Sequence, residues 1–216
     1  MKMIDLPDFH THTPGKSLGI LNLGIPESPS TGIYSMGLHP WYLNGNWEKA
    51  LEILTKKLED PRIVAVGECG FDGIRGPGLA IQKAAFEAQA ALAKSLGLPI
   101  ILHCVKGLHL LQEFLKKHSQ PIIWHGFNLH PDAGKSLLGQ PVYFSFGKHI
   151  LVAGTQAQAW LKICPLDKVF FETDDSGLPI ETIYRQASLI LGLPIERLRE
   201  VALGNWNRIS SRKIHG

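Results

Sequence analysis

The sequence has little cysteine, a small excess of charge and no long apolar run. Its three cysteines, Cys69, Cys104 and Cys164, are an odd number without CxxC spacing, which predicts reduced thiols rather than a disulfide framework. No apolar run approaches the roughly 18 residues that a membrane span needs. Residues 1–8 lack the apolar core and small-residue cleavage site of an export signal. We therefore expect a cytoplasmic protein without a membrane partner.

The charge and composition fit a folded globular protein. The net charge of +3 permits an anionic substrate without demonstrating one, because nucleic-acid-binding proteins usually have a stronger basic bias. Apolar residues make up 44% of the chain and charged residues 19%, which is ordinary for such proteins. The 216 residues show no break in composition and no internal repeat. This predicts a single domain over residues 1–216, and nothing in the sequence indicates an obligate protein partner.

Eight short runs of β-branched and aromatic residues predict strands, and helical patterns lie between the later ones. The expected strands are 7–12, 18–23, 33–38, 63–68, 99–104, 121–126, 142–147 and 168–174. The expected helices are 47–59, 79–96, 108–118, 157–163, 181–191 and 195–212, with a short one at 132–139. This alternation predicts an α/β fold, a TIM-like (β/α)₈ barrel. Segments 13–17 and 24–32 are too short and too rich in Pro, Gly and Ser for crossover helices. The barrel should therefore be distorted and lack one or two early helices.

Metal-ligand side chains stand at the ends of five expected strands: His10, His12, Glu68, His103, His125 and Asp174. His10 and His12 point the same way because side chains alternate along a strand. Taken singly, His103 and His125 are explained about as well by a hydrogen bond to a backbone carbonyl. The pair His10 and His12 alone is more simply explained as polar residues at a strand end. A carboxylate after an apolar run, as at Glu68, is costly to bury unless it is paired or metal-bound. Convergence of all six at one end of a barrel predicts one or two divalent ions and suggests a hydrolase.

At these residues the chain resembles the TatD family of metal-dependent hydrolases, a branch of the amidohydrolase-like barrels. The similarity runs in order from Asp8 to about Asp175, and Gln82, Phe86 and Asn205 also fit its pattern. Its motifs here are His10-Thr11-His12, Gly37-Leu38-His39-Pro40, Gly67-Glu68-Cys69-Gly70-Phe71-Asp72, Leu102-His103-Cys104, Trp124-His125-Gly126-Phe127 and Glu172-Thr173-Asp174. The resemblance implies that the six residues at the strand ends ligate two divalent ions, which are Mg²⁺, Mn²⁺ or Zn²⁺. It also implies a deoxyribonuclease that hydrolyses DNA from the 3′ end with a metal-activated water.

The resemblance suggests a role for individual side chains. Glu68 bridges the two ions, and Asp174 ligates one ion and takes the proton of the attacking water. We expect His39 to contact the substrate or leaving group, with a structural His-Pro turn as the alternative. We expect Arg75 and Lys106 to contact a phosphate, with ordinary solvated cations as the alternative. Lys148 is a weaker candidate of the same kind.

Two further carboxylates are expected behind the ligands. Glu172 either orients a ligand or pairs with a buried cation, and Asp72 either orients a ligand or caps the following turn. Cys69 and Cys104 adjoin ligands, but strand alternation turns them toward the opposite face, so we expect small core residues. The remaining histidines have no assigned function: His109, His118, His130, His149 and His215.

The chain departs from the family pattern in two places. The stretch between His12 and His39 is compressed, and the basic loop that usually follows Glu-Thr-Asp is replaced by Asp175-Ser176-Gly177-Leu178-Pro179. That loop would help to hold a phosphate-bearing substrate, so two other functions stay open. One is hydrolysis of a small phosphoester, an amide or a lactone on the same metal centre. The other is an inactive homologue that binds metal or nucleic acid, which the intact ligand set disfavours.

Overall fold

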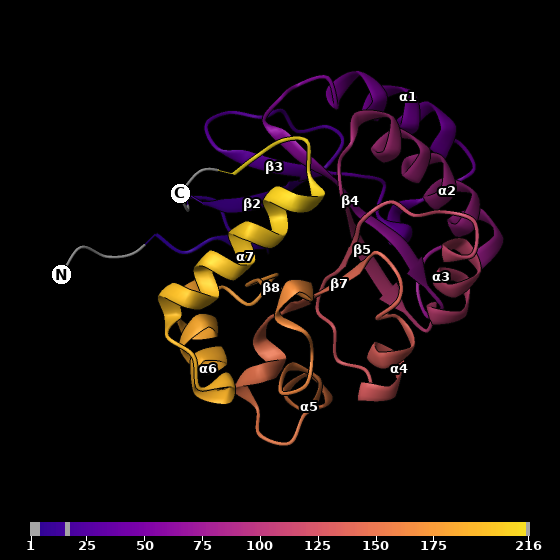
Figure 1. Ribbon diagram of the computed structural model, residues 1–216. Coiled ribbons are helices and arrows are strands. Elements are labelled where there is room, and N and C mark those ends of the chain that lie inside the picture. Colours follow the sequence, from indigo (N-terminus) through magenta and orange to yellow (C-terminus); the bar gives the residue numbers. More distant parts are fainter. Residues whose placement is uncertain (1–4, 16–17, 215–216) are drawn as a thin grey trace.

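The eight strands form one parallel sheet that curls into a nearly closed barrel (Figure 1). The computed structural model describes residues 5–15 and 18–214. His215, two residues of the segment 13–17 and half of the residues 1–8 lie outside this range. The strands follow the order of the sequence and are β1 (Asp8–Thr11), β2 (Gly19–Leu23), β3 (Ile33–Met36), β4 (Ile63–Asp72), β5 (Ile100–Val105), β6 (Ile122–Trp124), β7 (Val142–Phe146) and β8 (Val169–Phe171). The expected TIM-like barrel is thereby confirmed.

Helices follow the later strands and lie outside the sheet (Figure 1). They are α1 (Trp47–Lys57), α2 (Leu79–Leu96), α3 (Leu108–Leu115), α4 (Pro131–Ser136), α5 (Gln156–Leu161), α6 (Ile180–Leu191) and α7 (Ile195–Ile209). Short 3₁₀ turns are η1 (Pro40–Tyr42), η2 (Lys148–Leu151) and η3 (Leu166–Lys168). Within residues 5–15 and 18–214, neither the β1–β2 nor the β2–β3 connection contains a helix. The prediction of missing early helices is therefore confirmed. None of the described helices combines the length and apolar content needed to cross a membrane.

Strand β4 extends four residues beyond its expected end at Glu68 because two glycines let it approach β5 closely. Gly70 has φ +145°, and a Cβ atom there would lie 2.1 Å from the carbonyl oxygen of His103. Gly67 has φ +150°, and its Cβ would lie 2.5 Å from the carbonyl oxygen of Ile101. Residues other than glycine rarely adopt such backbone angles. The pairing of β4 with β5 also shifts register between Val66 and Cys69. The predicted strand 63–68 was therefore too short.

The buried core lies inside the barrel and between the barrel and its helices. Phe9 on β1 packs against Phe170 on β8 with ring centroids 4.6 Å apart, and against Trp206 on α7 at 5.7 Å. All three side chains are fully buried, and each contributes on the order of 1.5–3 kcal/mol of apolar burial. Helix α7 thus covers the line where the last strand meets the first. Cys69 is buried and Cys104 is partly buried against the core, which agrees with their expected packing.

Candidate metal centre

The six candidate ligands lie together at the carboxyl end of the barrel. His10, Glu68 and His103 are on β1, β4 and β5. His12, His125 and Asp174 stand just after β1, β6 and β8, since β6 and β8 end at Trp124 and Phe171. The predicted strands 121–126 and 168–174 were therefore too long, because they included His125 and Asp174. The carboxyl ends of parallel strands meet at one face of a barrel, so residues far apart in the chain converge there.

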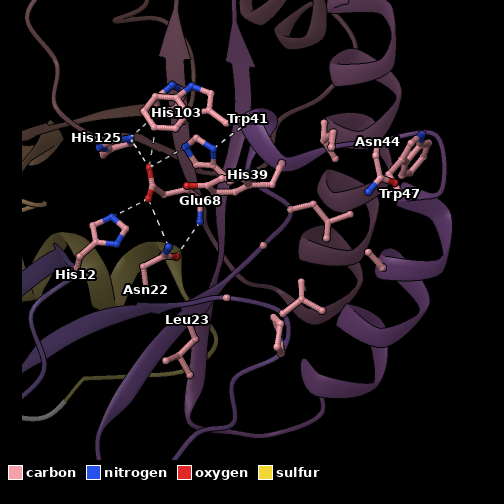
Figure 2. A pocket seen from close by; sticks show the side chains of 18 of the residues that line it. His12, Asn22, Leu23, His39, Trp41, Asn44, Trp47, Glu68, His103 and His125 are labelled. Atoms are coloured by element: carbon pink, nitrogen blue, oxygen red, sulfur yellow. Dashed lines mark hydrogen bonds and ion pairs between the residues drawn. The ribbon is translucent and has the colours of Figure 1, made fainter. Parts of the chain in front are cut away.

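The carboxylate of Glu68 faces a different set of histidines through each of its oxygens (Figure 2). Oε1 lies 2.9 Å from Nε2 of His12 and 3.4 Å from Nε2 of His10. Oε2 lies 2.9 Å from Nε2 of His125 and 3.7 Å from Nδ1 of His103. The side chain is only 5% exposed. One buried carboxylate therefore stands between two clusters of imidazole nitrogens.

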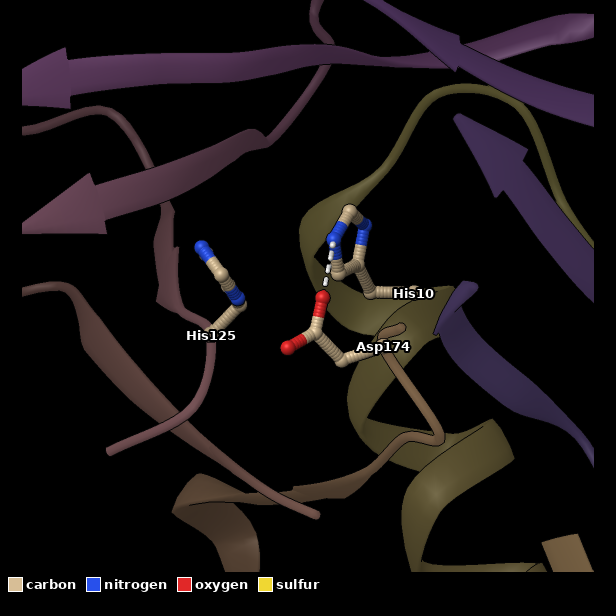
Figure 3. A group of neighbouring side chains, drawn as sticks. All are labelled: His10, His125 and Asp174. Atoms are coloured by element: carbon tan, nitrogen blue, oxygen red, sulfur yellow. Dashed lines mark ion pairs between the residues drawn. The ribbon is translucent and has the colours of Figure 1, made fainter. Parts of the chain in front are cut away.

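Asp174 completes the cluster on the Oε1 side of Glu68. Its Oδ1 lies 3.6 Å from Nε2 of His10 and 3.6 Å from Nε2 of His12, and Figure 3 shows its carboxylate between His10 and His125. The residue has φ +52°, in a turn where its backbone bridges to β1. Its pKa is lowered to about 2, because contacts with His10 and His125 outweigh burial, which alone would raise it. Asp174 is therefore ionised at neutral pH.

The electrostatics of this cluster require positive charge next to Glu68. Burial alone would lower the pKa of His10, but Glu68 and Asp174 raise it to about 9. The pKa of His125 is likewise raised well above its ordinary value against the effect of burial. Burial alone would raise the pKa of Glu68, but His10 and His125 hold it far below the usual range. The charge of Glu68 can be balanced by protons on the histidines or by a cation in their place.

The donor atoms fit divalent metal ions. Three groups of ligand atoms each lie within 4.8 Å of one another, namely His10/His12/Glu68, His10/His125/Asp174 and His39/Glu68/His103. Both ring nitrogens of His10 are buried without a hydrogen-bond partner, and a metal ion bound to one of them would satisfy it. Imidazole nitrogens and carboxylate oxygens together suit Zn²⁺ and Mn²⁺, and carboxylates suit Mg²⁺.

Asp72 fixes the orientation of His103. Its Oδ2 accepts hydrogen bonds from Nε2 of His103 at 3.0 Å and from Nε1 of Trp41 at 2.5 Å. Its Oδ1 accepts from the backbone N–H groups of Ile74 and Arg75 at 2.8 and 2.9 Å. With Nε2 bonded to a carboxylate, His103 presents the lone pair of Nδ1 toward Glu68. The two expectations for Asp72, orienting a ligand and capping a turn, both correspond to observed contacts.

Glu172 supports the loop that carries His125. It is fully buried, and its Oε1 accepts from the backbone N–H of Gly126 at 2.6 Å. The same oxygen lies 3.8 Å from Nδ1 of His125. Glu172 therefore holds the backbone beside His125, and its Oε2 has no hydrogen-bond partner.

His39 lies beside the cluster and its tautomer is fixed by a turn. Its Nδ1 accepts from the backbone N–H of Trp41 at 3.2 Å, and its Nε2 lies 3.7 Å from Oε2 of Glu68. Burial lowers its pKa to about 4, although Glu68 acts in the opposite direction. The ring is thus neutral at pH 7 with its proton on Nε2. It therefore serves as a turn residue and also directs a donor into the site.

Two residues of the site were not predicted from the sequence. Asn22 on β2 accepts from the backbone N–H of Glu68 at 3.0 Å through Oδ1 and donates to Oε1 of Glu68 at 3.4 Å through Nδ2. Trp41 donates to Asp72. The only sign of Asn22 in the sequence is an amide inside the apolar strand Ile20–Leu23. The only indication of Trp41 in the sequence is that it directly follows the His39-Pro40 motif.

The expected phosphate-binding cations lie outside the cavity over this cluster. The guanidinium carbon of Arg75 sits 4.5 Å from the ring centroid of Trp41. Lys106 is exposed. Lys148 pairs with Asp175, and its Nζ lies 3.9 Å from Oδ2 of Asp174. The structure brings none of these three cations into the cavity wall.

Comparisons with known proteins agree with this geometry. Residues 11–188 match the model of the family described as TatD related DNase. The chain is 34% identical over 152 residues to the 3′-5′ ssDNA/RNA exonuclease TatD of Edwardsiella piscicida, covering 67% of this chain and 56% of that protein. It is 30% identical over 198 residues to the uncharacterized metal-dependent hydrolase YjjV of Escherichia coli, covering 83% of this chain and 74% of that protein.

The crystal structure of YjjV has the same fold. It superimposes with a TM-score of 0.76 at 22% identity, covering 89% of this chain and 85% of that structure. The chain spans only a little more than half the length of the exonuclease relatives.

Proposed function

Because the chain belongs to the TatD related DNase family, we propose that it is a divalent-metal-dependent hydrolase of phosphodiester bonds that shortens DNA from the 3′ end. Relatives with 29–34% identity are named 3′-5′ ssDNA/RNA exonucleases, which supports this choice of substrate. The observation that carries the proposal is the position of Glu68. Its two oxygens face separate sets of imidazole nitrogens at 2.9 Å each.

The ligand assignment follows the two sides of Glu68. His10, His12 and Asp174 would hold one ion with Oε1, and His103 and His125 would hold the second with Oε2. Mg²⁺, Mn²⁺ or Zn²⁺ bound there would lower the pKa of bound water and neutralise charge on the substrate oxygens. Asp72 and Glu172 act behind this layer by holding His103 and the loop of His125.

One side chain takes up a proton and another donates a hydrogen bond. Asp174 is ionised and borders the cavity, so its carboxylate accepts the proton of the attacking water. His39 points Nε2–H into the cavity and donates a hydrogen bond to the leaving oxygen as the phosphorus–oxygen bond breaks. Asn22 holds the backbone and the side chain of Glu68 and keeps the carboxylate between the two histidine sets.

A second candidate is hydrolysis of a small phosphoester on the same centre. The turn after Asp174 carries Asp175 and no basic residue as far as Pro179. Arg75, Lys106 and Lys148 lie outside the cavity wall. A long DNA strand needs several cations along its phosphates, whereas a small ester needs only the metal centre.

The deciding experiment is degradation of end-labelled single-stranded DNA by the purified protein with Mg²⁺ or Mn²⁺. We expect stepwise shortening from the 3′ end by the wild type and none by Asp174→Asn, with equal circular dichroism spectra. If both leave DNA intact while metal analysis finds bound ions, DNA is the wrong substrate, and bis(p-nitrophenyl) phosphate tests the second candidate. If neither substrate is turned over in the presence of metal, the proposed hydrolase function is contradicted.

A further inference from the structure

The cavity over the metal centre continues well beyond it. It has a volume of about 630 Å³, which is within the usual range for small-molecule sites. One end reaches Glu68 and the neighbouring histidines, and Figure 2 shows Trp47 and Asn44 far from that carboxylate, beside a helix. We call the distant part the apolar arm; its apolar lining is Leu23, Ile25, Pro26, Leu43, Trp47 and Ala50, and the amides Asn44 and Asn46 also line the cavity.

A hydrogen bond joins the two segments that form the walls of the apolar arm. One wall is the start of the helix-free β2–β3 connection, and the other is the start of α1 with the segment before it. The ammonium group of Lys57 on α1 donates to the carbonyl oxygen of Glu27 in that connection. The side chain of Glu27 accepts from the backbone N–H of Gly24. These contacts join the β2–β3 connection to the last residue of α1, so the two segments that line the arm also meet outside it.

The charge around the cavity disfavours further anions. Among the described residues that line it, none is lysine or arginine, and three are the carboxylates Glu68, Asp174 and Asp175. Two of the described cations are engaged elsewhere, since Arg75 stacks on Trp41 and Lys148 pairs with Asp175. A second phosphate in the arm would lose its hydration without gaining a cation. An uncharged group would gain apolar contact instead.

We propose that the apolar arm binds an uncharged aromatic or branched aliphatic group on the same molecule as the scissile ester. The proposal rests on the proposed hydrolysis for the position of that ester over Glu68. Two sources carry this chemistry, namely a small aryl or alkyl phosphoester and the terminal nucleobase of a DNA strand. Burying such a ring strengthens binding about 10- to 100-fold over the same head group without it.

Isothermal titration calorimetry with three phosphonates in the presence of Mn²⁺ tests this subsite. Methylphosphonate carries the head group alone, benzylphosphonate adds a ring, and the 5′-methylenephosphonate of 5′-deoxythymidine adds a nucleoside linked to the head group as the terminal nucleoside of a DNA strand is linked to the scissile phosphate. Their carbon–phosphorus bonds resist hydrolysis, so the result does not depend on turnover. We expect benzylphosphonate to bind about 10- to 100-fold more tightly than methylphosphonate. Equal affinity would overturn the proposal.

Substitutions that fill the arm with a larger side chain test the subsite, and the same substitution outside the arm is the control. Ala50→Phe on α1 places a ring in the arm and should remove most of the preference for benzylphosphonate, and the smaller Ala50→Leu should give an intermediate ratio. Ala91→Phe adds the same ring on the exposed face of α2 and should behave as wild type. If the nucleoside phosphonate also loses affinity in Ala50→Phe, the arm accepts a base. If only benzylphosphonate does, the source is a small aryl ester. An unchanged ratio in Ala50→Phe contradicts the subsite.

A measurement without metal separates the arm from the metal centre. Benzyl alcohol has the ring and no phosphonate, so its binding does not depend on the proposed ions. Saturation-transfer NMR should detect it on the metal-free wild type and on Ala91→Phe, and much more weakly on Ala50→Phe. Failure here with intact metal-dependent hydrolysis rejects only the arm. Success here without hydrolysis rejects only the proposed function.

Discussion

Asp72 connects three parts of the site through one carboxylate. It accepts from His103 and Trp41 with one oxygen and from the backbone N–H groups of Ile74 and Arg75 with the other. Hydrogen bonds from Trp41 and His103 outweigh burial and lower its pKa to about 2. An ionised acceptor on the far nitrogen of a ligating histidine fixes its ring and raises its basicity. The direction in which His103 points is therefore set from behind.

We expect Asp72→Asn to weaken metal binding about 10- to 100-fold while the fold remains. The amide nitrogen that replaces Oδ2 accepts no hydrogen bond from either His103 or Trp41, so the imidazole is free to turn. Titration calorimetry with Mn²⁺ measures the effect. Asp132→Asn on α4, where the side chain is 73% exposed, is the matched control and should bind as wild type. Equal affinity of Asp72→Asn and wild type would show that Asp72 only caps the turn.

The stability of the metal-free protein should fall as the pH rises from neutral to above 9. Glu68 and Asp174 raise the pKa of His10 from about 6.5 to about 9 in the folded protein. A group whose pKa is raised by folding stabilises the fold below its unfolded pKa, and this contribution is lost as the pH passes the folded value. Urea unfolding with EDTA should therefore show a decrease between pH 7 and pH 9.5 that is smaller in His10→Asn, where the raised pKa of His125 still contributes. With saturating Mg²⁺ the decrease should shrink, because the ion replaces the proton. A flat profile for the metal-free wild type would contradict this account.

At the scale of elements, helix α2 holds two segments of the site through buried glutamines. Gln82 and Gln89 are each 1% exposed and seven residues apart, so they share one face of the helix. Gln82 accepts from the backbone N–H of Asp72 at 2.6 Å and donates to its carbonyl oxygen at 2.9 Å. Gln89 accepts from the N–H of Leu38 at 2.6 Å and donates to its carbonyl oxygen at 3.3 Å. The backbone before His39 and at Asp72 is thus fixed by one helix.

Replacing Gln89 with alanine should destabilise the protein by about 1–3 kcal/mol, because the buried N–H and carbonyl of Leu38 lose their side-chain partner. Since His39 follows Leu38, hydrolysis should also slow, and kcat should fall more than metal affinity. Urea unfolding and steady-state kinetics measure the two effects. Gln112→Ala, an exposed glutamine on α3, should change neither. If Gln89→Ala keeps both its stability and kcat, the contact has no role in the site.

These contacts show which parts of the site can be predicted from a single sequence. His10, His103 and Asp174 follow apolar strands, and parallel strands all end at one face, so their convergence was predictable. Asn22 contacts Glu68 over 46 residues, and Gln89 contacts Leu38 over 51. No periodicity marks such pairs, because each depends on how far apart the finished elements lie. The extension of β4 beyond Glu68 could not be predicted from the sequence for the same reason, since it depends on the approach of β5.

At the scale of the whole molecule, the barrel closes where the two ends of the ligand set meet. The backbone N–H of His12 donates to the carbonyl oxygen of Asp174 at 3.1 Å, and that of Asp174 donates to His10 at 3.0 Å. Below them, Asp8 accepts from the backbone N–H and the hydroxyl of Thr173 at 3.0 and 2.6 Å. Closure of the barrel therefore assembles one side of the candidate metal centre from residues more than 160 positions apart.

We expect Asp8→Ala to lower the free energy of unfolding by about 1–3 kcal/mol, because the buried N–H and hydroxyl of Thr173 lose their acceptor. Mn²⁺ affinity should fall as well, since His10, His12 and Asp174 depend on that closure. Urea unfolding followed by circular dichroism and by tryptophan fluorescence should give one coincident transition, as expected of a single domain. Asp132→Ala, at an exposed position, should leave both quantities unchanged. Unaltered metal affinity in Asp8→Ala would show that the ligands are held independently of the closure, and separate transitions in the wild type would rule out a single cooperative barrel.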